Sequence, residues 1–255
     1  TVISESITAW ENDLVSHDAT AREYVIINST AGHLKEAIAA AGKDYTKLKN
    51  LKITGQINRT DFYFMRDEMS LLQALNLKEV RIKSDGRSDV YNPSYPDDQI
   101  PGSAFFWSST MQGKDLVRLV LPDTLKSIGD HAFYGCKYLS GSLIIPEGVE
   151  EIQMGAFNNC TGLNGTLSLP TTLKYLGTKG NDPNKETADE GNDYYGGVFQ
   201  NCSGLVGELI LPDNLELIRG YCFSGCNGLT GELRLPDKLR RLGNCAFSGC
   251  EGFTG

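Results

Sequence analysis

The sequence lacks several features that whole classes of protein require. It has no run of 18 apolar residues, which argues against a membrane span, and its first residues carry neither the basic start nor the apolar core of a signal peptide. A secreted chain from which a signal peptide had been removed would begin in the same way. The net charge is −8 and the isoelectric point about 5.0, with Lys and Arg scattered along the chain. This charge argues against nucleic acid and anionic membranes as partners.

Catalytic and metal-binding motifs are also missing. The three histidines, His17, His33 and His131, lie in different parts of the chain, and no G-x-S-x-G, H-E-x-x-H, Walker or dinucleotide motif occurs. We interpret His131 as a surface residue, because it occupies a variable position. The seven cysteines form neither a C-x-x-C motif nor a Cys/His pattern with zinc spacing. We therefore expect a protein that is not an enzyme and has no metal or cofactor.

What the sequence contains instead is an internal repeat. Five phenylalanines recur at intervals of 24, 42, 24 and 24 residues, and columns of cysteine and proline follow the same period. The long interval exceeds the others by 18 residues, which indicates an insertion in one repeat. The columns are Phe133, Phe157, Phe199, Phe223 and Phe247; Cys136, Cys160, Cys202, Cys226 and Cys250; and Pro122, Pro146, Pro170, Pro212 and Pro236.

A repeat this short buries its apolar face only against copies of itself, which predicts a solenoid. The pattern L-x-L-P-x-x-L-x-x-I-G-x-x-A-F-x-x-C, present as LVLPDTLKSIGDHAFYGC, resembles the BspA-type leucine-rich repeats of bacterial surface proteins over about residues 100–255. Arg219, Cys222 and the insertion depart from that pattern. The resemblance implies an α/β fold, a right-handed solenoid with a parallel β-sheet on its concave side. It also implies a cell-surface or secreted location.

We divide the chain into an N-terminal α/β cap over residues 1–45 and a leucine-rich repeat solenoid over residues 46–255. The cap is predicted to hold a strand at 24–27 and a helix at 31–41, capped by Ser29 or Thr30 and stopped by Gly42, with a further helix at 5–15. The solenoid comprises degenerate repeats over 46–121, regular 24-residue repeats over 122–255 and the insertion at about 178–197.

Within the solenoid, the segment 61–75 predicts a helix with Thr60 or Asp61 as its N-cap. Stretches such as 149–152 predict a second short strand in each regular repeat. Glycines recur just before the main strands, which indicates a bulge or a positive φ. The predicted main strands are 51–53, 80–82, 119–121, 143–145, 167–169, 209–211 and 233–235, and the glycines are Gly141, Gly165, Gly207 and Gly231.

The cysteine column predicts five unpaired buried thiols beside the phenylalanines, because free cysteine is often buried and side chains in register point in parallel. The insertion has the composition of a flexible loop. Its acidic residues could bind calcium, but their spacing does not match an EF-hand loop, so we favour a solvated loop without metal. These acidic residues are Asp182, Asp189, Glu190 and Asp193.

Side chains alternate along a strand, so one column of each repeat should point out of the concave face. Val120, Ile144 and Ile210 are apolar members of that column, either because β-branched residues favour strands or because they form the centre of a recognition patch. The column is Lys52, Arg81, Val120, Ile144, Ser168, Ile210 and Arg234, and the one before it is Asn50, Glu79, Arg118, Ser142, Thr166, Glu208 and Glu232. We take Arg118, Val120, Ile144, Ser168, Ile210 and Arg234 as the candidate ligand-binding residues.

Two functions fit these observations. The first is an adhesion-like module that binds an extracellular protein, for example a host protein, as the resemblance implies. The second is a glycan-binding or accessory module of a larger secreted protein. The predicted concave columns contain no aromatic residue, which favours the first, and Tyr194 and Tyr195 in the insertion are where the second would lie. The chain stops where the next L-x-L-P strand is expected, which suggests a fragment of a longer protein or a last edge that pairs with another chain.

Overall fold

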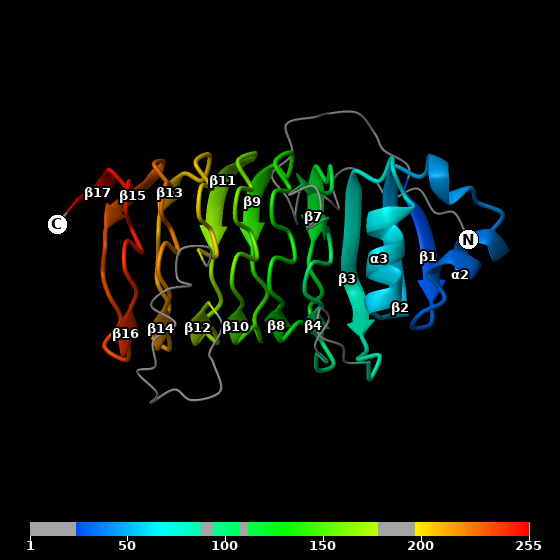
Figure 1. The fold of residues 1–255 in the computed structure, drawn as a ribbon, viewed down its shortest axis with the longest axis horizontal. Coiled ribbons are helices and arrows are strands. Elements are labelled where there is room, and N and C mark those ends of the chain that lie inside the picture. The colour runs from blue at the N-terminus through cyan, green and yellow to red at the C-terminus, as the bar shows by residue number, and fades with distance from the viewer. Residues whose placement is uncertain (1–23, 88–93, 108–111, 178–196, 255) are drawn as a thin grey trace.

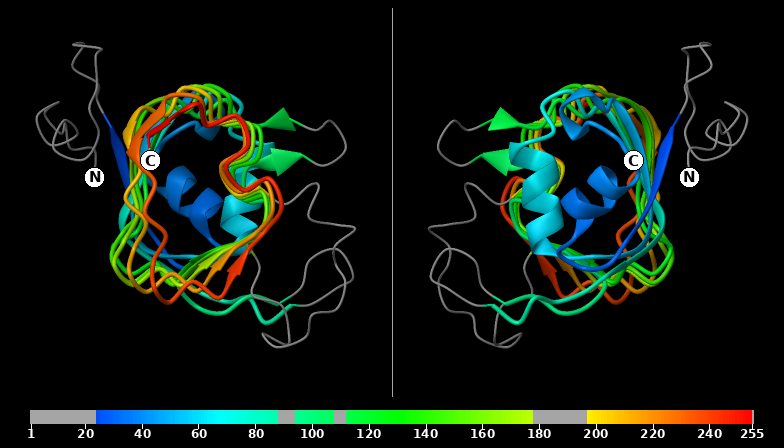
Figure 2. Two further views of the ribbon diagram at one scale, coloured as in Figure 1. Left: turned by 90° about the vertical axis from the view of Figure 1, so that its left-hand side faces the viewer. Right: turned by 90° about the vertical axis from the view of Figure 1, so that its right-hand side faces the viewer.

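The computed structural model describes residues 24–87, 94–107, 112–177 and 197–254. These residues form turns of a solenoid, here called coils, which are stacked side by side along the long axis of the molecule (Figure 1). Viewed along that axis, the coils superpose around a common interior (Figure 2). Two lines of short parallel strands run along the stack, one strand from each line in most coils.

The first strand line contains three parallel sheets. The sheets are β1 (Val25–Ser29), β2 (Asn50–Ile57), β3 (Ala74–Ile82) and β7 (Arg118–Val120); β9 (Gly141–Ile144) with β11 (Leu163–Ser168); and β13 (Gly207–Glu208), β15 (Leu229–Glu232) and β17 (Gly252–Thr254). In Figure 1 they follow one another along the same side of the stack. The predicted parallel-sheet solenoid is confirmed, whereas its handedness, the concave position of this line and the division at residue 45 stay predictions.

The second strand line is one continuous parallel sheet of six two-residue strands. Five of these strands bury one apolar residue in the core, whereas Leu242 in the last strand is 46% exposed. This line confirms the second short strand that the regular repeats predict. Its strands are β4 (Gln99–Ile100), β8 (Ser127–Ile128), β10 (Glu151–Ile152), β12 (Tyr175–Leu176), β14 (Leu217–Ile218) and β16 (Arg241–Leu242). Outside both lines, β5 (Phe106–Trp107) and β6 (Gln112–Gly113) form a separate antiparallel pair.

The phenylalanine column is the spine of the core, as predicted. Successive rings from Phe133 to Phe247 stack with centroids 5.1–5.6 Å apart and planes within 19° of parallel. The stack extends further toward the N-terminus, where Phe105 stacks on Phe133 at 5.4 Å and Phe62 meets Phe105 edge-on at 5.8 Å. Large buried aromatic areas of this kind dominate core energetics, so the column joins the early and the regular repeats into one core.

The cysteine column runs beside these rings, and all seven cysteines are unpaired. Each thiol of the column donates a hydrogen bond to the carbonyl oxygen of a phenylalanine one coil earlier, as from Cys160 to Phe133 at 3.2 Å and from Cys226 to Phe199 at 3.1 Å. Burial raises the pKa of Cys136 and of Cys226 to about 12. The prediction of buried free thiols is confirmed except at Cys250, which is only half-buried.

The helix predicted at 31–41 is present as the shorter α2 (Leu34–Ala40), and the positive φ of Gly42 follows it as expected. Its predicted cap is wrong. Neither Ser29 nor Thr30 caps the helix; instead the carboxylate of Asp61 accepts hydrogen bonds from the amides of Gly32 and Leu34, at 2.6 and 2.9 Å. The cap therefore comes from a residue about 30 positions away. A short 3-10 helix, η1 (Tyr45–Lys47), follows α2.

The second predicted helix is present as α3, but it is shorter, covering Arg59–Asp67, and its N-cap is Asn58 rather than Thr60 or Asp61. The Asn58 side chain accepts from the amide of Thr60 at 2.9 Å, and Asp61 accepts from the amide of Asn58 at 2.9 Å, which completes a capping box. Residues after Asp67 leave the helix because β3 begins at Ala74 and pairs with β2. None of the helices in the described residues has the length and apolar composition needed to cross a bilayer.

The register of the early strands also differs from the predicted one. Leu51 pairs with Leu75, and Leu75 with Leu119, so Arg81 lies opposite Gln56 and not beside Lys52. Arg81 therefore leaves the outward column, and Asn76 takes its place. The repeat alignment failed here because the sequence holds two overlapping matches to the strand pattern, at 72–77 and 77–82, and β2 pairs with the first of them.

The predicted strands at 209–211 and 233–235 are not formed, because β13 ends at Glu208 and β15 at Glu232. The recurring glycines explain this difference. Gly207 pairs with Leu229 rather than with the equivalent Gly231, and both glycines have a φ near 90°. Gly141 also has a φ near 90°, and the pairing of β9 with β11 shifts register between Leu163 and Leu167. The predicted positive φ and bulge are thus both present, although Gly165 itself has no positive φ, and the strand pairing falls on the residues around each glycine.

Candidate functional site

The structure exposes four of the six predicted ligand-binding residues on the first strand line. Ile144 and Ile210 are 49% and 69% exposed, and Ser168 and Arg234 are exposed as well. Ser168 lies opposite Ile144 on the neighbouring strand, and Ile210 follows one coil later. Ile210 lies two coils from Ile144, and the stacked rings of those coils are 5.1 and 5.6 Å apart, so the two isoleucines stand about 10 Å apart. They lie close enough to contact one partner together.

The other two predicted residues are not on a free surface. Arg118 is only 9% exposed, and Val120 is half-buried. Val120 packs against Tyr24 and Ala74, which form a small apolar cluster on the outward side of the first sheet. The prediction that Arg118 is an exposed contact is therefore wrong, because this outward face is covered at the N-terminal end of the stack.

A third exposed apolar residue lies four positions before Ile210, in the same coil. Val206 is 44% exposed and lies just before the bulge at Gly207. The alternation used to select outward residues did not find it, because the bulge changes which side chains point outward. We call Ile144, Val206 and Ile210 the apolar patch.

Hydroxyl and charged side chains surround the apolar patch. The Thr166 amide and hydroxyl both hydrogen-bond to the Ser142 hydroxyl, at 3.1 and 3.2 Å, and Asn164 accepts from the Gly141 amide at 2.8 Å. Arg234 forms an exposed ion pair with Glu232 at 2.7 Å. The surface thus has an apolar centre with a polar rim, as protein interfaces often do.

A second candidate surface, which the sequence did not reveal, is a polar groove of about 610 Å³. One wall comes from the first turns of α3 and the segment around Tyr95, and the other from the coils that carry β4, β8 and β10. Gln99, Ser127 and Glu151 are equivalent residues of those three strands and lie side by side along the groove. We call this surface the polar groove.

The first wall of the polar groove is firmly held. The Arg59 guanidinium stacks 4.7 Å above the Tyr95 ring, and its Nε lies 3.6 Å from the buried Asp85 carboxylate. The Tyr95 hydroxyl accepts from the Arg59 amide and donates to the Lys83 carbonyl, both at 2.8 Å. Burial raises the pKa of Tyr95 to about 12, so the phenol keeps its proton at neutral pH.

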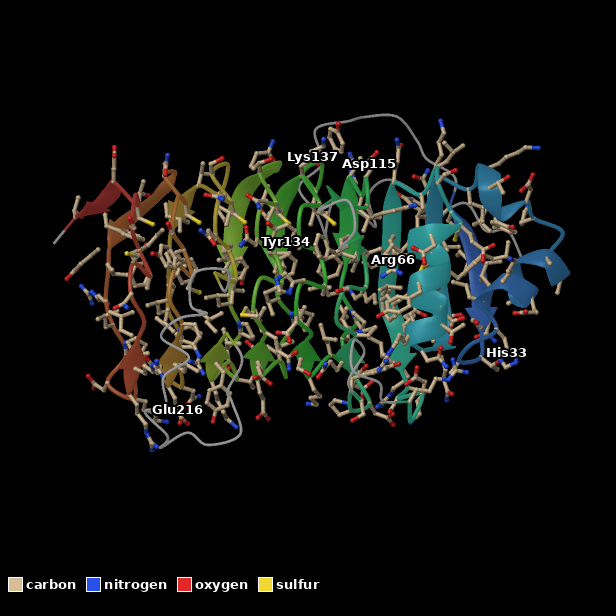
Figure 3. The ribbon with its side chains drawn as sticks, viewed as in Figure 1. His33, Arg66, Asp115, Tyr134, Lys137 and Glu216 are labelled. Carbon is tan, nitrogen blue, oxygen red and sulfur yellow. The ribbon has the colours of Figure 1, made fainter. Side chains whose placement is uncertain are left out.

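His131 forms part of the opposite wall and is not the surface residue we predicted. It is half-buried, and its ring stacks with Phe106 and contacts Tyr134 at centroid distances of 5.8 and 5.5 Å. Burial lowers the pKa of His131, which favours the neutral imidazole. Arg66 joins α3 to this wall by donating to the Ser103 carbonyl at 2.8 Å; Arg66 and Tyr134 are both labelled in Figure 3.

The described residues contain no group of three or more His, Cys, Asp or Glu side chains that could hold a metal ion. The acidic residues of the insertion, together with Tyr194, Tyr195, His17 and the predicted helix at 5–15, lie outside the described residues.

Comparisons with known proteins give one matching family model and several similar solved structures. A family model described as the BspA type leucine-rich repeat region matches residues 100–180 and 194–254 in six copies. A leucine-rich repeat protein of T. pallidum is 30% identical, with 62% of this chain and 61% of that chain covered and a TM-score of 0.44. A leucine-rich repeat protein from Bacteroides ovatus ATCC 8483 is 24% identical, with 88% of this chain and 49% of that chain covered and a TM-score of 0.49.

This chain spans less than two thirds of the length of either of those two proteins. No curated protein matches the sequence. The family model alone matches more than half of the 255 residues, and it does so over the coils that carry the stacked phenylalanines and both strand lines. The chain belongs to the BspA-type leucine-rich repeat family.

Proposed function

We propose that the chain is a non-catalytic recognition module that binds a protein ligand through the apolar patch and its polar rim. Leucine-rich repeats of this family are protein-interaction modules and typically non-enzymatic scaffolds. The observation that carries the proposal is the exposure of Ile144 and Ile210, at 49% and 69%, on one face of the stack. Exposed apolar groups rimmed by polar ones mark interaction surfaces.

The proposed setting is the cell surface or the extracellular medium, and the proposed partner an extracellular protein, for example one of a host. Members of the family are typically extracellular or surface-associated, which supports this setting. Because the net charge of the chain is −8, a partner with a basic surface would associate with it faster than a partner with an acidic surface. The role is thus adhesion-like.

The test is a binding screen against a panel of immobilised extracellular matrix and serum proteins, followed by Ile144→Asp and Ile210→Asp. Truncating a hot-spot side chain near the centre of an interface lowers the binding free energy by about 2 kcal/mol or more, so each variant should weaken binding about 30-fold or more. Both side chains are exposed, so the melting temperature should not change. Leu71→Asp is the matched control, because Leu71 is 45% exposed and lies after α3, outside the patch.

A partner that binds both patch variants as tightly as the unmodified protein would show that the recognition surface is elsewhere. Equal weakening by Leu71→Asp would show a general effect of added negative charge. Either result would overturn the assignment of the apolar patch.

A further inference from the structure

The polar groove has the dimensions of a small-molecule site. Its volume of about 610 Å³ falls within the range of about 300–1,000 Å³ that ligand pockets occupy. Gln99, Ser127 and Glu151 lie on three adjacent strands, so at the usual strand spacing they extend over about 10 Å. An elongated ligand lying across these strands would contact all three side chains.

Most hydrogen-bonding groups in the groove are neutral. Gln99 and Gln153 contribute amides, Ser127 and Tyr63 hydroxyls, and His131 an imidazole. Amides and hydroxyls offer both donors and acceptors, and a sugar hydroxyl likewise donates one hydrogen bond and accepts others. A ligand rich in hydroxyl groups therefore matches this lining better than one with a single kind of polar atom.

The charges of the groove disfavour an anionic ligand. Among the described residues, Asp130 and Glu151 line it as carboxylates, and the lining guanidinium of Arg59 lies 3.6 Å from the Asp85 carboxylate. A phosphate, sulfate or uronate would therefore lie close to groups of like charge. The same carboxylates would attract a cationic group, so the choice of a neutral ligand rests on the neutral amides and hydroxyls that make up most of the lining.

The floor of the groove is held in place before any ligand binds. Ser127 donates to the Gln99 side-chain oxygen at 2.8 Å, which leaves the Gln99 NH₂ group and the Ser127 lone pairs for a ligand. The backbone amide of Asp130 donates to the Gln153 side-chain oxygen at 3.1 Å. Gln99 and Ser127 are only 8% and 7% exposed, so they lose little side-chain freedom on binding.

From these features we propose that the polar groove binds a neutral oligosaccharide. Gln99, Ser127 and Glu151 form the hydrogen-bonding floor, and Tyr63 and His131 stand at its walls. The proposal is independent of the protein-binding function, because none of these residues belongs to the first strand line that carries the apolar patch.

The first experiment is an array of neutral, sulfated, sialylated and uronate-containing glycans probed with the intact chain, together with oligoarginine and oligolysine peptides. Neutral oligosaccharides should bind, and their anionic counterparts with the same backbone should not. Calorimetry should show an affinity that does not fall with added salt, because no ion pair forms. Binding of anionic glycans alone, of basic peptides alone or of no member of the array would overturn the proposal.

The second experiment places binding in the groove. Ser127→Ala and Glu151→Gln should each weaken oligosaccharide binding about tenfold or more. The matched controls are Ser168→Ala and Glu232→Gln, which make the same chemical changes at exposed positions of the first strand line and should leave binding unchanged. If both groove variants bound the oligosaccharide as tightly as the unmodified protein, the site would be refuted. Melting temperatures would separate loss of binding from loss of fold.

The two proposals fail separately. Ile144→Asp and Ile210→Asp should leave oligosaccharide binding intact, and Ser127→Ala should leave protein binding intact. A patch variant that abolishes glycan binding while its melting temperature is unchanged would contradict the groove assignment.

Discussion

Replacing Phe157 with alanine tests the central structural claim, that stacked phenylalanines hold the coils together. Phe157 is fully buried, and its ring lies between Phe133 and Phe199 at 5.1 and 5.6 Å, with both interplanar angles at 9°. Truncating a buried phenylalanine costs about 3–5 kcal/mol. Because two aromatic pairs are lost, each contributing about 0.5–1.5 kcal/mol beyond its buried area, the upper part of that range applies.

The assay is equilibrium unfolding in urea followed by circular dichroism, together with a thermal scan. A loss of about 4–5 kcal/mol corresponds to a fall in melting temperature of roughly 8–20 °C for a chain of this size. Phe247→Ala is the graded comparison. Phe247 is only partly buried, with one stacked neighbour at 5.3 Å and one edge contact at 5.9 Å, so its truncation should cost about half as much.

An exposed aromatic provides the negative control. Tyr138 is 51% exposed, and Tyr138→Ala should change the free energy of unfolding by less than about 0.5 kcal/mol. If Phe157→Ala lost less than about 1 kcal/mol, the ring would lie outside the core and the spine would be refuted. Equal losses for Phe157→Ala and Phe247→Ala would show that stacking on both sides adds nothing.

Three further predictions concern single groups. Thiol titration should find one fast-reacting cysteine in the native protein, Cys245, and seven after denaturation without reductant; fewer than seven would reveal a disulfide. Asp61→Ala should destabilise the fold by about 1–3 kcal/mol, because amides at the starts of both α2 and α3 lose their acceptor; an unchanged urea midpoint would contradict this role. Burial lowers the pKa of His131 in the folded protein, and the nearby Asp130 partly opposes this shift. The stability that the neutral imidazole contributes should therefore be fully present above the unfolded pKa of about 6.5, and it should be lost as the pH falls toward the pKa of the folded state. The fall should be smaller in His131→Phe, and identical pH profiles would exclude this contribution.

Groups that repeat once per coil could be predicted from the sequence. The columns of Phe, Cys and Pro follow one period, so each member must meet its own copy in the next coil, and the spine, the parallel pairing and the buried thiols follow from that. The recurring glycines likewise predicted the bulge, because only a local backbone requirement explains a glycine at the same place in every repeat. Periodicity also identified Ile144 and Ile210 as outward-facing.

Contacts between parts of the chain that do not repeat were decided only by the tertiary structure. Asp61 caps a helix that begins at Leu34, and Val120 packs against Tyr24 and Ala74, which helps to cover the face that carries Arg118. No local pattern records such pairs, because they depend on where distant segments come together. The polar groove is the largest example, because residues from α3, from the segment around Tyr95 and from three coils come together as one site only in the folded solenoid.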